Sequence, residues 1–483
     1  MRREETEALG TKPNILWICT DQQRTDTLGC YGNGDVETPT IDALAAGGAQ
    51  FLHCFAQAPV CTPSRASFLT GRYPRTTGCR QNGQDIAADE VLISRTLAEA
   101  GYSCGLAGKL HVSACHPRVA PVGEHRVDDG YAEFHWSHHP GQDWPTNQYG
   151  RWLAEHGVEY RTPPFAECRH VRTGMPEAWH QTTWCAEQAI GFIRQHAGGK
   201  RPWLMSLNLF DPHHPFDPPA EDLRRWERRL DQVELPNYVP GELDDKPDTQ
   251  RLCHHGAYGI PGHLAADAMT ERDHRWLRVA YWAMCELIDR QMARVLDALE
   301  ETGQRENTLV IFMSDHGELL GDHGIYLKGP FFYDPAVQVP LILSWPGVIP
   351  AGRHADLVEL LDLAPTLLEA MGLPGQPGMQ GRSLWSGLRS GVVEGRPDVY
   401  SEYVNAGFPP RVCVTMLRTE RRKLVVHHGA EVGELYDLET DAAERHNRWD
   451  DPAYATDKMA MMQRLCDRMA WTADPLPLRR APW

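Results

Sequence analysis

The chain has 483 residues, with 48 lysines and arginines against 65 aspartates and glutamates, and a formal net charge of −17. This acidic balance argues against nucleic-acid binding, which usually goes with a basic excess. The hydrophobic content of 42% is enough for a sizeable core and argues against disorder. An acidic chain that binds an anionic substrate must concentrate its positive charge in a pocket.

The 13 cysteines show no C-x-x-C spacing, which argues against a secreted disulfide framework and a structural zinc site. The N-terminal segment 1–5 is charged, and the first apolar run, Ile15 to Cys19, is too short for a signal-peptide core. No stretch approaches the length of a membrane span. We therefore expect a cytoplasmic protein that binds neither membrane nor nucleic acid, and the sequence is compatible with a homo-oligomer.

Short apolar runs bounded by turn residues recur along the chain and predict strands. These runs are Ile15 to Cys19, Tyr102 to Ala107, Leu204 to Leu209, Leu309 to Met313 and Val339 to Leu343. Continuous apolar runs fit strands that are buried on both faces, so we expect an α/β fold with a large central, mostly parallel sheet covered by helices. The clearest helix runs from about Asp273 to Glu301, with a capping box at Thr270 and Asp273 and a stop at Gly303.

Segment 112–180 is rich in His, Trp and Pro and segment 235–265 in His and Pro, and both lack clean periodicity, which is typical of functional rims or lids. After about residue 390 the pattern changes to short strand-like pieces at 412–416 and 423–427. We therefore predict a catalytic α/β domain over residues 1–390 and a smaller C-terminal α+β subdomain over residues 391–483.

Polar side chains directly follow four of the predicted strands. They are Asp21 and Gln22, Lys109 and His111, the Asp211 to Phe216 segment with His213, and Asp315 and His316. Function in open α/β sheets gathers at the carboxyl ends of strands. Two carboxylates, an amide oxygen and an imidazole could share one divalent cation there. Taken singly, each such residue is more often a helix cap or a turn former.

Cys61 opens the run Cys61-Thr62-Pro63-Ser64-Arg65. Thr62 is a suitable N-cap, Pro63 fits the first helical position, and Gly71 ends the predicted helix. Cys61 would then lie at a helix N-terminus, where free N–H groups favour an anion, and Arg65 could clamp an oxyanion. The alternative is a buried cysteine in front of an ordinary helix.

The run from Cys61 to Arg65 resembles the motif of type I sulfatases, of the alkaline-phosphatase-like superfamily, in which a maturation enzyme oxidises the cysteine to Cα-formylglycine. Further similar segments follow in the family order over nearly the whole chain: 14–21, 101–111, 212–216, 314–317, Lys328 before 332–333, and 434–439. The resemblance implies a hydrolase that cleaves sulfate monoesters to an alcohol and inorganic sulfate.

The resemblance also implies a metal site. Asp21, Gln22, Asp315 and His316 would bind one divalent ion together with the modified side chain of Cys61. Many members have a second Asp at the position of Gln22 and an Asn at the position of His316. The ion would be Ca²⁺ or Mn²⁺, and the imidazole nitrogen favours Mn²⁺.

The remaining implied roles concern the substrate. Arg65, Lys109 and Lys328 would hold the sulfate. His111 would take a proton from the second hydroxyl of the hydrated aldehyde, and His213 would contact the ester oxygen and assist the leaving group. The substrate would be a small sulfate ester of a sugar, aryl or alkyl alcohol, and the formylglycine-generating enzyme would be a maturation partner.

Two alternatives stay open on the sequence. The same site could hydrolyse phosphonate monoesters or phosphodiesters, although Thr62 and Ser64 resemble sulfatases more closely. In the second alternative, the chain is a catalytically silent binding protein in which Cys61 is never oxidised.

Overall fold

The computed structural model describes residues 12–141, 146–405 and 411–481; the charged segment 1–5 considered above lies outside them. The strands are β1 (Asn14–Thr20), β2 (Ala49–Phe55), β3 (Ser103–Gly108), β4 (Glu133–Trp136), β5 (Pro164–Phe165), β6 (Cys168–Arg172), β7 (Trp203–Asn208), β8 (Thr308–Ser314), β9 (Gln338–Ser344), β10 (Gly352–Glu359), β11 (Val399–Asn405), β12 (Val412–Arg418), β13 (Arg422–His427) and β14 (Gly433–Asp437). The α-helices are α1 (Pro39–Ala46), α2 (Cys61–Thr70), α3 (Pro74–Thr77), α4 (Ile93–Glu99), α5 (Gln148–Glu155), α6 (Gln181–Gln195), α7 (Ala220–Trp226), α8 (Asp248–His254), α9 (Glu271–Glu301), α10 (Asp334–Val337), α11 (Leu363–Ala370), α12 (Trp385–Ser390) and α13 (Ala455–Trp471).

The central sheet has eight strands in the order β10-β2-β9-β8-β1-β7-β3-β4. Neighbours from β8 through β1, β7 and β3 to β4 pair in parallel, whereas β9 is antiparallel to both β8 and β2. The predicted mostly parallel α/β sheet is therefore confirmed. Strand direction is not encoded in the apolar run of β9, so the sequence could not reveal the reversal.

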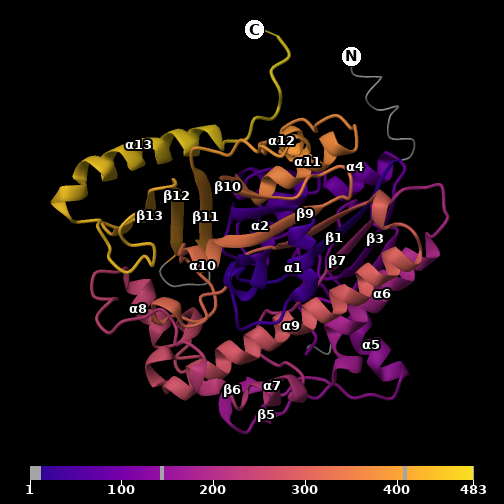
Figure 1. Ribbon diagram of the computed structural model, residues 1–483. Coiled ribbons are helices and arrows are strands. Elements are labelled where there is room, and N and C mark those ends of the chain that lie inside the picture. The colour runs from indigo at the N-terminus through magenta and orange to yellow at the C-terminus, as the bar shows by residue number, and fades with distance from the viewer. Residues whose placement is uncertain (1–11, 142–145, 406–410, 482–483) are drawn as a thin grey trace.

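Helices cover both faces of this sheet, with α2, α4, α11 and α12 on one side and α1, α6 and α9 on the other (Figure 1). Alternate residues of β1 enter the two resulting cores. Trp17 packs in the first core and Ile18 in the second, and both are buried. This explains why the strand reads as a continuous apolar run.

The long predicted helix is confirmed as α9, which begins two residues earlier than expected. Its capping box is formed: the Thr270 hydroxyl accepts from the Asp273 N–H, and the Asp273 carboxylate accepts from the Thr270 N–H. The two irregular segments contain short elements, namely β4, α5, β5 and β6 in the first and α8 in the second. None of these exceeds eight residues, which is too short for periodicity to reveal.

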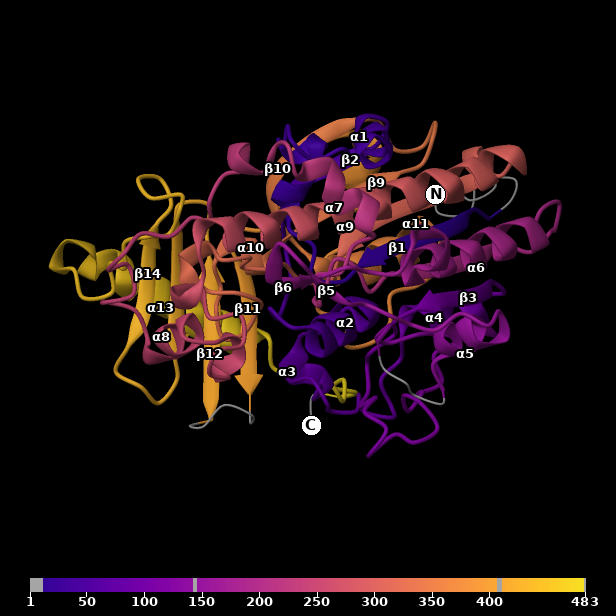
Figure 2. The same ribbon diagram turned by 90° about the horizontal axis from the view of Figure 1, so that it is seen from below.

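A second sheet of four antiparallel strands, β11-β12-β13-β14, lies beside the central sheet, with α13 packed against it (Figure 2). The strand-like pieces at 412–416 and 423–427 fall within β12 and β13. A smaller C-terminal unit is thus present, and its exact boundary at residue 390 stays a prediction. Among the described residues, no helix has the length and apolarity needed to cross a membrane.

Candidate functional site

Parallel pairing brings the polar strand-end residues to one edge of the sheet. The N–H of Asp315 donates to the carbonyl of Thr20, which directly precedes Asp21. On the other side of β1, the N–H of Asp21 donates to the Asp211 carbonyl, and the N–H of Lys109 donates to the Asn208 carbonyl. The residues that follow β1, β3, β7 and β8 therefore meet at their common carboxyl end, as the sequence predicts.

The helix that carries Cys61 faces this edge. Helix α2 begins at Cys61 itself, all ten of its residues are buried, and Gly71 ends it with φ 70°. The prediction that Thr62 caps the helix is wrong: the N-cap is Val60, which has extended backbone angles and makes no side-chain cap. Thr62 is instead engaged elsewhere, because its hydroxyl lies 3.0 Å from Nε2 of His111.

Four potential metal ligands converge at the start of α2. Donor atoms of Asp21, Cys61, Asp315 and His316 lie within 4.8 Å of one another, and all four residues are buried. The Cys61 sulfur lies 3.2 Å from His316 Nε2 and 3.6 Å from Asp21 Oδ1. Two carboxylates and an imidazole suit a divalent cation such as Ca²⁺ or Mn²⁺, so the residues present fit the expected ion.

Gln22 lies beside these four potential metal ligands. Its backbone is left-handed with φ 66°, and its N–H donates to Asp315 Oδ1 over 3.0 Å. Its side-chain nitrogen donates to the Glu318 carboxylate, and its side-chain oxygen accepts from Lys328 Nζ. Glu318 thereby fixes the orientation of the amide, with the oxygen on the side of Lys328 and Cys61.

Three buried cations surround the carboxylates. Nε of Arg65 donates to Asp315 Oδ2 over 2.8 Å, and Lys109 Nζ donates to Asp21 Oδ2. The third cation, Lys328, has its Nζ 3.4 Å from the Cys61 sulfur. The three cations are thus gathered in one place, which is the local concentration of positive charge that an acidic chain needs in order to bind an anion.

These charges act on the ionisable groups of the site. Burial and the Asp21 carboxylate raise the pKa of the Cys61 thiol, but Lys109, Lys328 and His316 lower it to about 7 overall. Burial also raises the pKa of Asp21, and Lys109 and Arg65 more than offset this, so that carboxyl stays ionised. The pocket therefore stabilises negative charge at the position of the Cys61 side chain.

The two predicted histidines differ in their closeness to Cys61. His111 contacts Thr62, the residue that follows Cys61, and has a left-handed backbone with φ 55°. His213 stacks on His214 with 4.1 Å between ring centroids, and none of its described contacts reaches Cys61. Burial and then Lys328 lower the pKa of His213, so its imidazole is neutral and feels the charge of the site.

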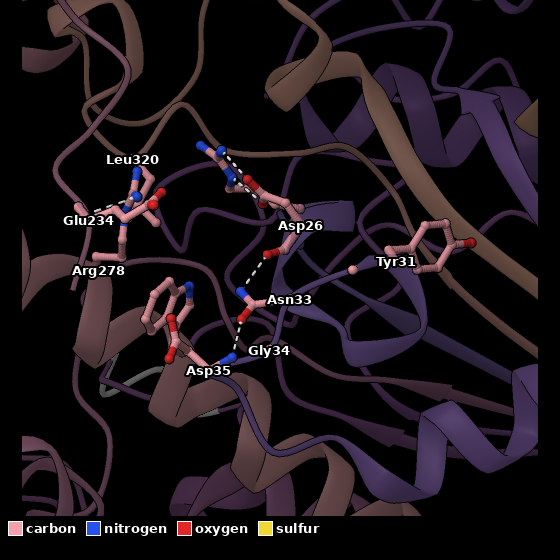
Figure 3. A pocket seen from close by; sticks show the side chains of 11 residues that line it. Asp26, Tyr31, Asn33, Gly34, Asp35, Glu234, Arg278 and Leu320 are labelled. Carbon is pink, nitrogen blue, oxygen red and sulfur yellow. Dashed lines mark hydrogen bonds and ion pairs between the residues drawn. The ribbon is translucent and has the colours of Figure 1, made fainter. Parts of the chain in front are cut away.

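The structure also has a pocket of about 350 Å³ with a different lining (Figure 3). It is lined by Arg24, Asp26, Tyr31, Gly32, Asn33, Gly34, Asp35, Glu234, Arg278, Trp282 and Leu320. Its charged groups are largely paired: Arg24 donates to Asp26 and to Asp322, and Arg278 also contacts Asp322. None of the residues predicted for catalysis lines it.

The assignment of roles from the sequence omitted two buried carboxylates beside the site. Glu318 stands in the run that follows β8, so its position after a strand was a usable signal. Glu124 accepts from the N–H groups of His111, Val112 and Ser113 and so fixes the backbone around His111. It lies in an irregular segment, where no pattern in the sequence marks it.

Comparison with known proteins agrees with this geometry. The family model described as Sulfatase matches residues 13–373, and the model described as N-sulphoglucosamine sulphohydrolase, C-terminal, matches residues 321–470. An uncharacterized sulfatase of Escherichia coli is 29% identical over 96% of this chain and 88% of its own length. An arylsulfatase of Clostridium perfringens is 28% identical over 82% of this chain and 81% of its own.

Among solved structures, a phosphonate monoester hydrolase from Silicibacter pomeroyi superposes with a TM-score of 0.82 at 26% identity, covering 96% of each chain. The alkaline-phosphatase-like fold is thus shared with an enzyme that is named for a related ester. Because the family model covers most of this chain and sulfatases recur among its relatives, the chain belongs to the sulfatase family and is a sulfuric ester hydrolase.

Proposed function

We propose that this sulfatase cleaves sulfate monoesters at the Cys61 site, after a maturation enzyme has converted Cys61 to Cα-formylglycine. The observation that carries the proposal is the position of the Cys61 sulfur. It is buried at the first residue of α2 and lies 3.2 Å from His316 Nε2 and 3.4 Å from Lys328 Nζ. A nucleophile at this position would face the metal ligands and the sulfate-binding cations together.

Asp21, Gln22, Asp315 and His316 would hold one divalent ion, Ca²⁺ or Mn²⁺. When bound, the ion would supply Lewis-acid polarisation, and the formylglycine would supply a hydroxyl nucleophile with a built-in route for expelling sulfate. Glu318 supports Gln22 as a ligand because it accepts from the side-chain nitrogen of Gln22. The side-chain oxygen is then left on the side of Lys328 and Cys61. Elemental analysis of the purified enzyme decides between the two metals.

The cations would bind the sulfate. Once a divalent ion offsets the carboxylates of Asp21 and Asp315, the charges of Arg65, Lys109 and Lys328 are available to an anion. All three side chains are buried and held in place, so they need no rearrangement when charge develops on the sulfate oxygens. Groups of this kind typically contribute about 3–4 kcal/mol each to transition-state stabilisation.

Two histidines would handle protons. His111 Nε2 lies 3.0 Å from the hydroxyl of Thr62, the residue that follows Cys61. This position suits His111 to accept a proton from the modified side chain. Burial and the nearby Lys109 lower its pKa well below the ordinary value, so the ring is neutral and can accept. His213, on the segment after β7, would contact the ester oxygen and assist departure of the alcohol.

Phosphonate monoester hydrolysis is the second candidate, favoured by the similarity to the solved phosphonate monoester hydrolase. Charge does not separate the two, because a phosphonate monoester and a sulfate monoester each carry one negative charge. The test is kcat/KM for sulfate and phosphonate esters with the same leaving group. We expect sulfate to be favoured by at least about tenfold, or about 1.4 kcal/mol. A ratio at or below one assigns the enzyme to phosphonate esters.

The alcohol is to be identified with a panel of aryl, sugar and choline sulfates, since the sequence and the site leave sugar, aryl and alkyl esters as candidates. We also propose that the protein works in a reducing compartment, the cytoplasm. This is supported by the cysteines, all 13 of which lie in described residues as free thiols. Homo-oligomer formation stays a prediction that light scattering can test.

A further inference from the structure

A second group of metal-binding side chains lies next to the proposed site. Donor atoms of His111, Cys115 and His138 lie within 4.8 Å of one another. The rings of His111 and His138 meet edge to face, with 4.3 Å between their centroids. His111 is 6% exposed and Cys115 9% exposed, whereas His138 is half-buried. These residues share no member with the Asp21, Cys61, Asp315 and His316 group.

The segments that carry these donors are tied together by Glu124. Its Oε2 accepts from the His111 N–H over 2.9 Å and from the Trp136 indole N–H over 3.1 Å. Trp136 ends β4, two residues before His138, and the Trp136 and His138 rings are stacked. One buried carboxylate thus fixes both chain segments. The fold therefore fixes the chain segments that carry His111 and His138.

His111 offers one nitrogen to this group. Its Nε2 contacts the Thr62 hydroxyl, whereas its Nδ1 is buried and has no hydrogen-bond partner in the part of the chain that the structure describes. Leaving a buried ring nitrogen unpaired is costly, typically about 1–3 kcal/mol. A ligand that occupies Nδ1 would remove that cost.

We propose that His111, Cys115 and His138 form a binding site for a second divalent ion of the zinc type. One thiolate and two imidazoles are the donors that Zn²⁺ prefers, and three protein ligands leave a fourth position for water. The proposed ion at Asp21 and Asp315 sees mainly oxygen, which suits Ca²⁺ or Mn²⁺ instead. The two sites therefore differ in the class of metal that they select.

Binding would require the Cys115 thiol to lose its proton. Burial, and next the Glu124 carboxylate, raise the pKa of Cys115 to about 12, so the thiol is protonated without an ion. The incoming metal displaces this proton to solvent as the sulfur–metal bond forms. No oxidant or other reactant is needed.

Occupancy would inhibit hydrolysis, an inference that rests on the proposed function of His111. A metal on Nδ1 forces the remaining ring proton onto Nε2. The Nε2, which contacts the Thr62 hydroxyl, could then no longer accept a proton. The site would thus make the sulfatase sensitive to free zinc.

Cobalt(II) tests the site without relying on activity, because a thiolate ligand produces a charge-transfer band in the near ultraviolet. The parent is Cys61→Ser, which removes the other candidate thiolate, with Ca²⁺ present to fill the oxygen-rich site. We expect the band to saturate at one cobalt per chain. It should disappear in Cys61→Ser/Cys115→Ser and persist in Cys61→Ser/Cys79→Ser, where Cys79 is a buried cysteine outside the group.

Absence of the band in the parent, or its persistence without Cys115, overturns the proposal. His138→Ala in the same parent keeps the thiol and should weaken cobalt binding at least about tenfold; unchanged binding also overturns the site. Circular dichroism confirms that each variant is folded, and the His138 variant decides the matter where the Cys115 variant does not fold.

A separate measurement tests inhibition. With the matured enzyme, Zn²⁺ should inhibit sulfate release, and Cys115→Ser should keep basal activity while losing at least about tenfold in zinc sensitivity. Equal inhibition of both forms rejects the inhibitory role. If the enzyme hydrolyses no sulfate ester, the proposed function fails, while the cobalt result still decides whether the metal site exists.

Discussion

Two of the buried networks of opposite charges in this molecule are built differently. One is the Cys61 site at the carboxyl edge of the central sheet. The other, which we call the joint, comprises Glu359, Asp362, Arg396 and Arg468 and links the end of β10 to the C-terminal sheet and α13. In the joint, Glu359 accepts from Tyr73, from the Tyr400 N–H and from Arg468, so both of its oxygens are satisfied within the protein.

The Cys61 site is arranged toward a shared centre. Donor atoms of Asp21, Asp315 and His316 face one another and the Cys61 sulfur. In the joint, Glu359 and Asp362 share Arg396, and Glu359 also pairs with Arg468. Gln22 and His111, beside the first network, have left-handed backbone, whereas none of the four residues of the joint does. Backbone strain of this kind is typical of functional sites. A buried ion pair alone therefore does not identify a catalytic centre, and it is the convergence of metal-ligand atoms that distinguishes the Cys61 site from the joint.

The largest expected effect is loss of the nucleophile. Cys61→Ala should lower kcat/KM at least about 10⁴-fold, because no other side chain can form the covalent intermediate. The control Cys413→Ala changes a half-buried cysteine of the C-terminal sheet and should keep activity. Peptide mass spectrometry after co-expression with a maturation enzyme should show loss of the thiol at Cys61. Full activity in Cys61→Ala would reject the assignment.

Breaking the joint should affect stability and leave turnover unchanged. Arg396→Met removes the guanidinium that contacts both Glu359 and Asp362, and leaves buried carboxylates without that partner. Removing one member of a buried pair typically costs about 3–5 kcal/mol of unfolding free energy. Urea denaturation measures this loss, and kcat of the folded enzyme should stay within about twofold. A large fall in kcat with normal stability would show that the joint takes part in turnover.

Weakening the metal site should instead lower turnover. Asp315→Asn keeps the size of the side chain but removes a charge that faces His316 and Arg65. We expect kcat/KM to fall about 100- to 1000-fold, the scale of one lost electrostatic contact in a transition state. Elemental analysis should show lower metal occupancy. If chelation leaves hydrolysis by the wild type untouched, the metal assignment is wrong.

The smallest effect concerns acid stability at the joint. Burial raises the pKa of Glu359, but Arg468 and Arg396 more than offset it, so its pKa lies below the ordinary 4.5. Its contribution to stability is thus full above about pH 4.5 and is lost as the pH falls through the folded-state pKa. Glu359→Gln should make the unfolding free energy less dependent on pH in this acid range, by at most about 1.4 kcal/mol per pH unit. An unchanged slope would contradict the ion pairing.

The sequence was sufficient for much of the fold and for the expectation that the residues after the parallel strands lie close together. Continuous apolar runs revealed β1, β3, β7, β8 and β9, and the residues directly after the parallel strands meet at one edge. This works because parallel strands present their carboxyl ends on the same side, so local position in the chain translates into spatial proximity. The Cys61 to Arg65 run and the placement of Asp315 after β8 needed no knowledge of distant contacts.

Contacts between distant segments were decided by the tertiary structure alone. Three features depend on a partner far away in the chain. They are the direction of β9, the contact between Thr62 and His111, and the orientation of Gln22 by Glu318. The same holds for the group of His111, Cys115 and His138, which Glu124 assembles in a segment without periodicity. Periodicity reports only which face of an element is buried. Which polar atoms satisfy one another is set when packing excludes water, and only the folded chain determines those pairs.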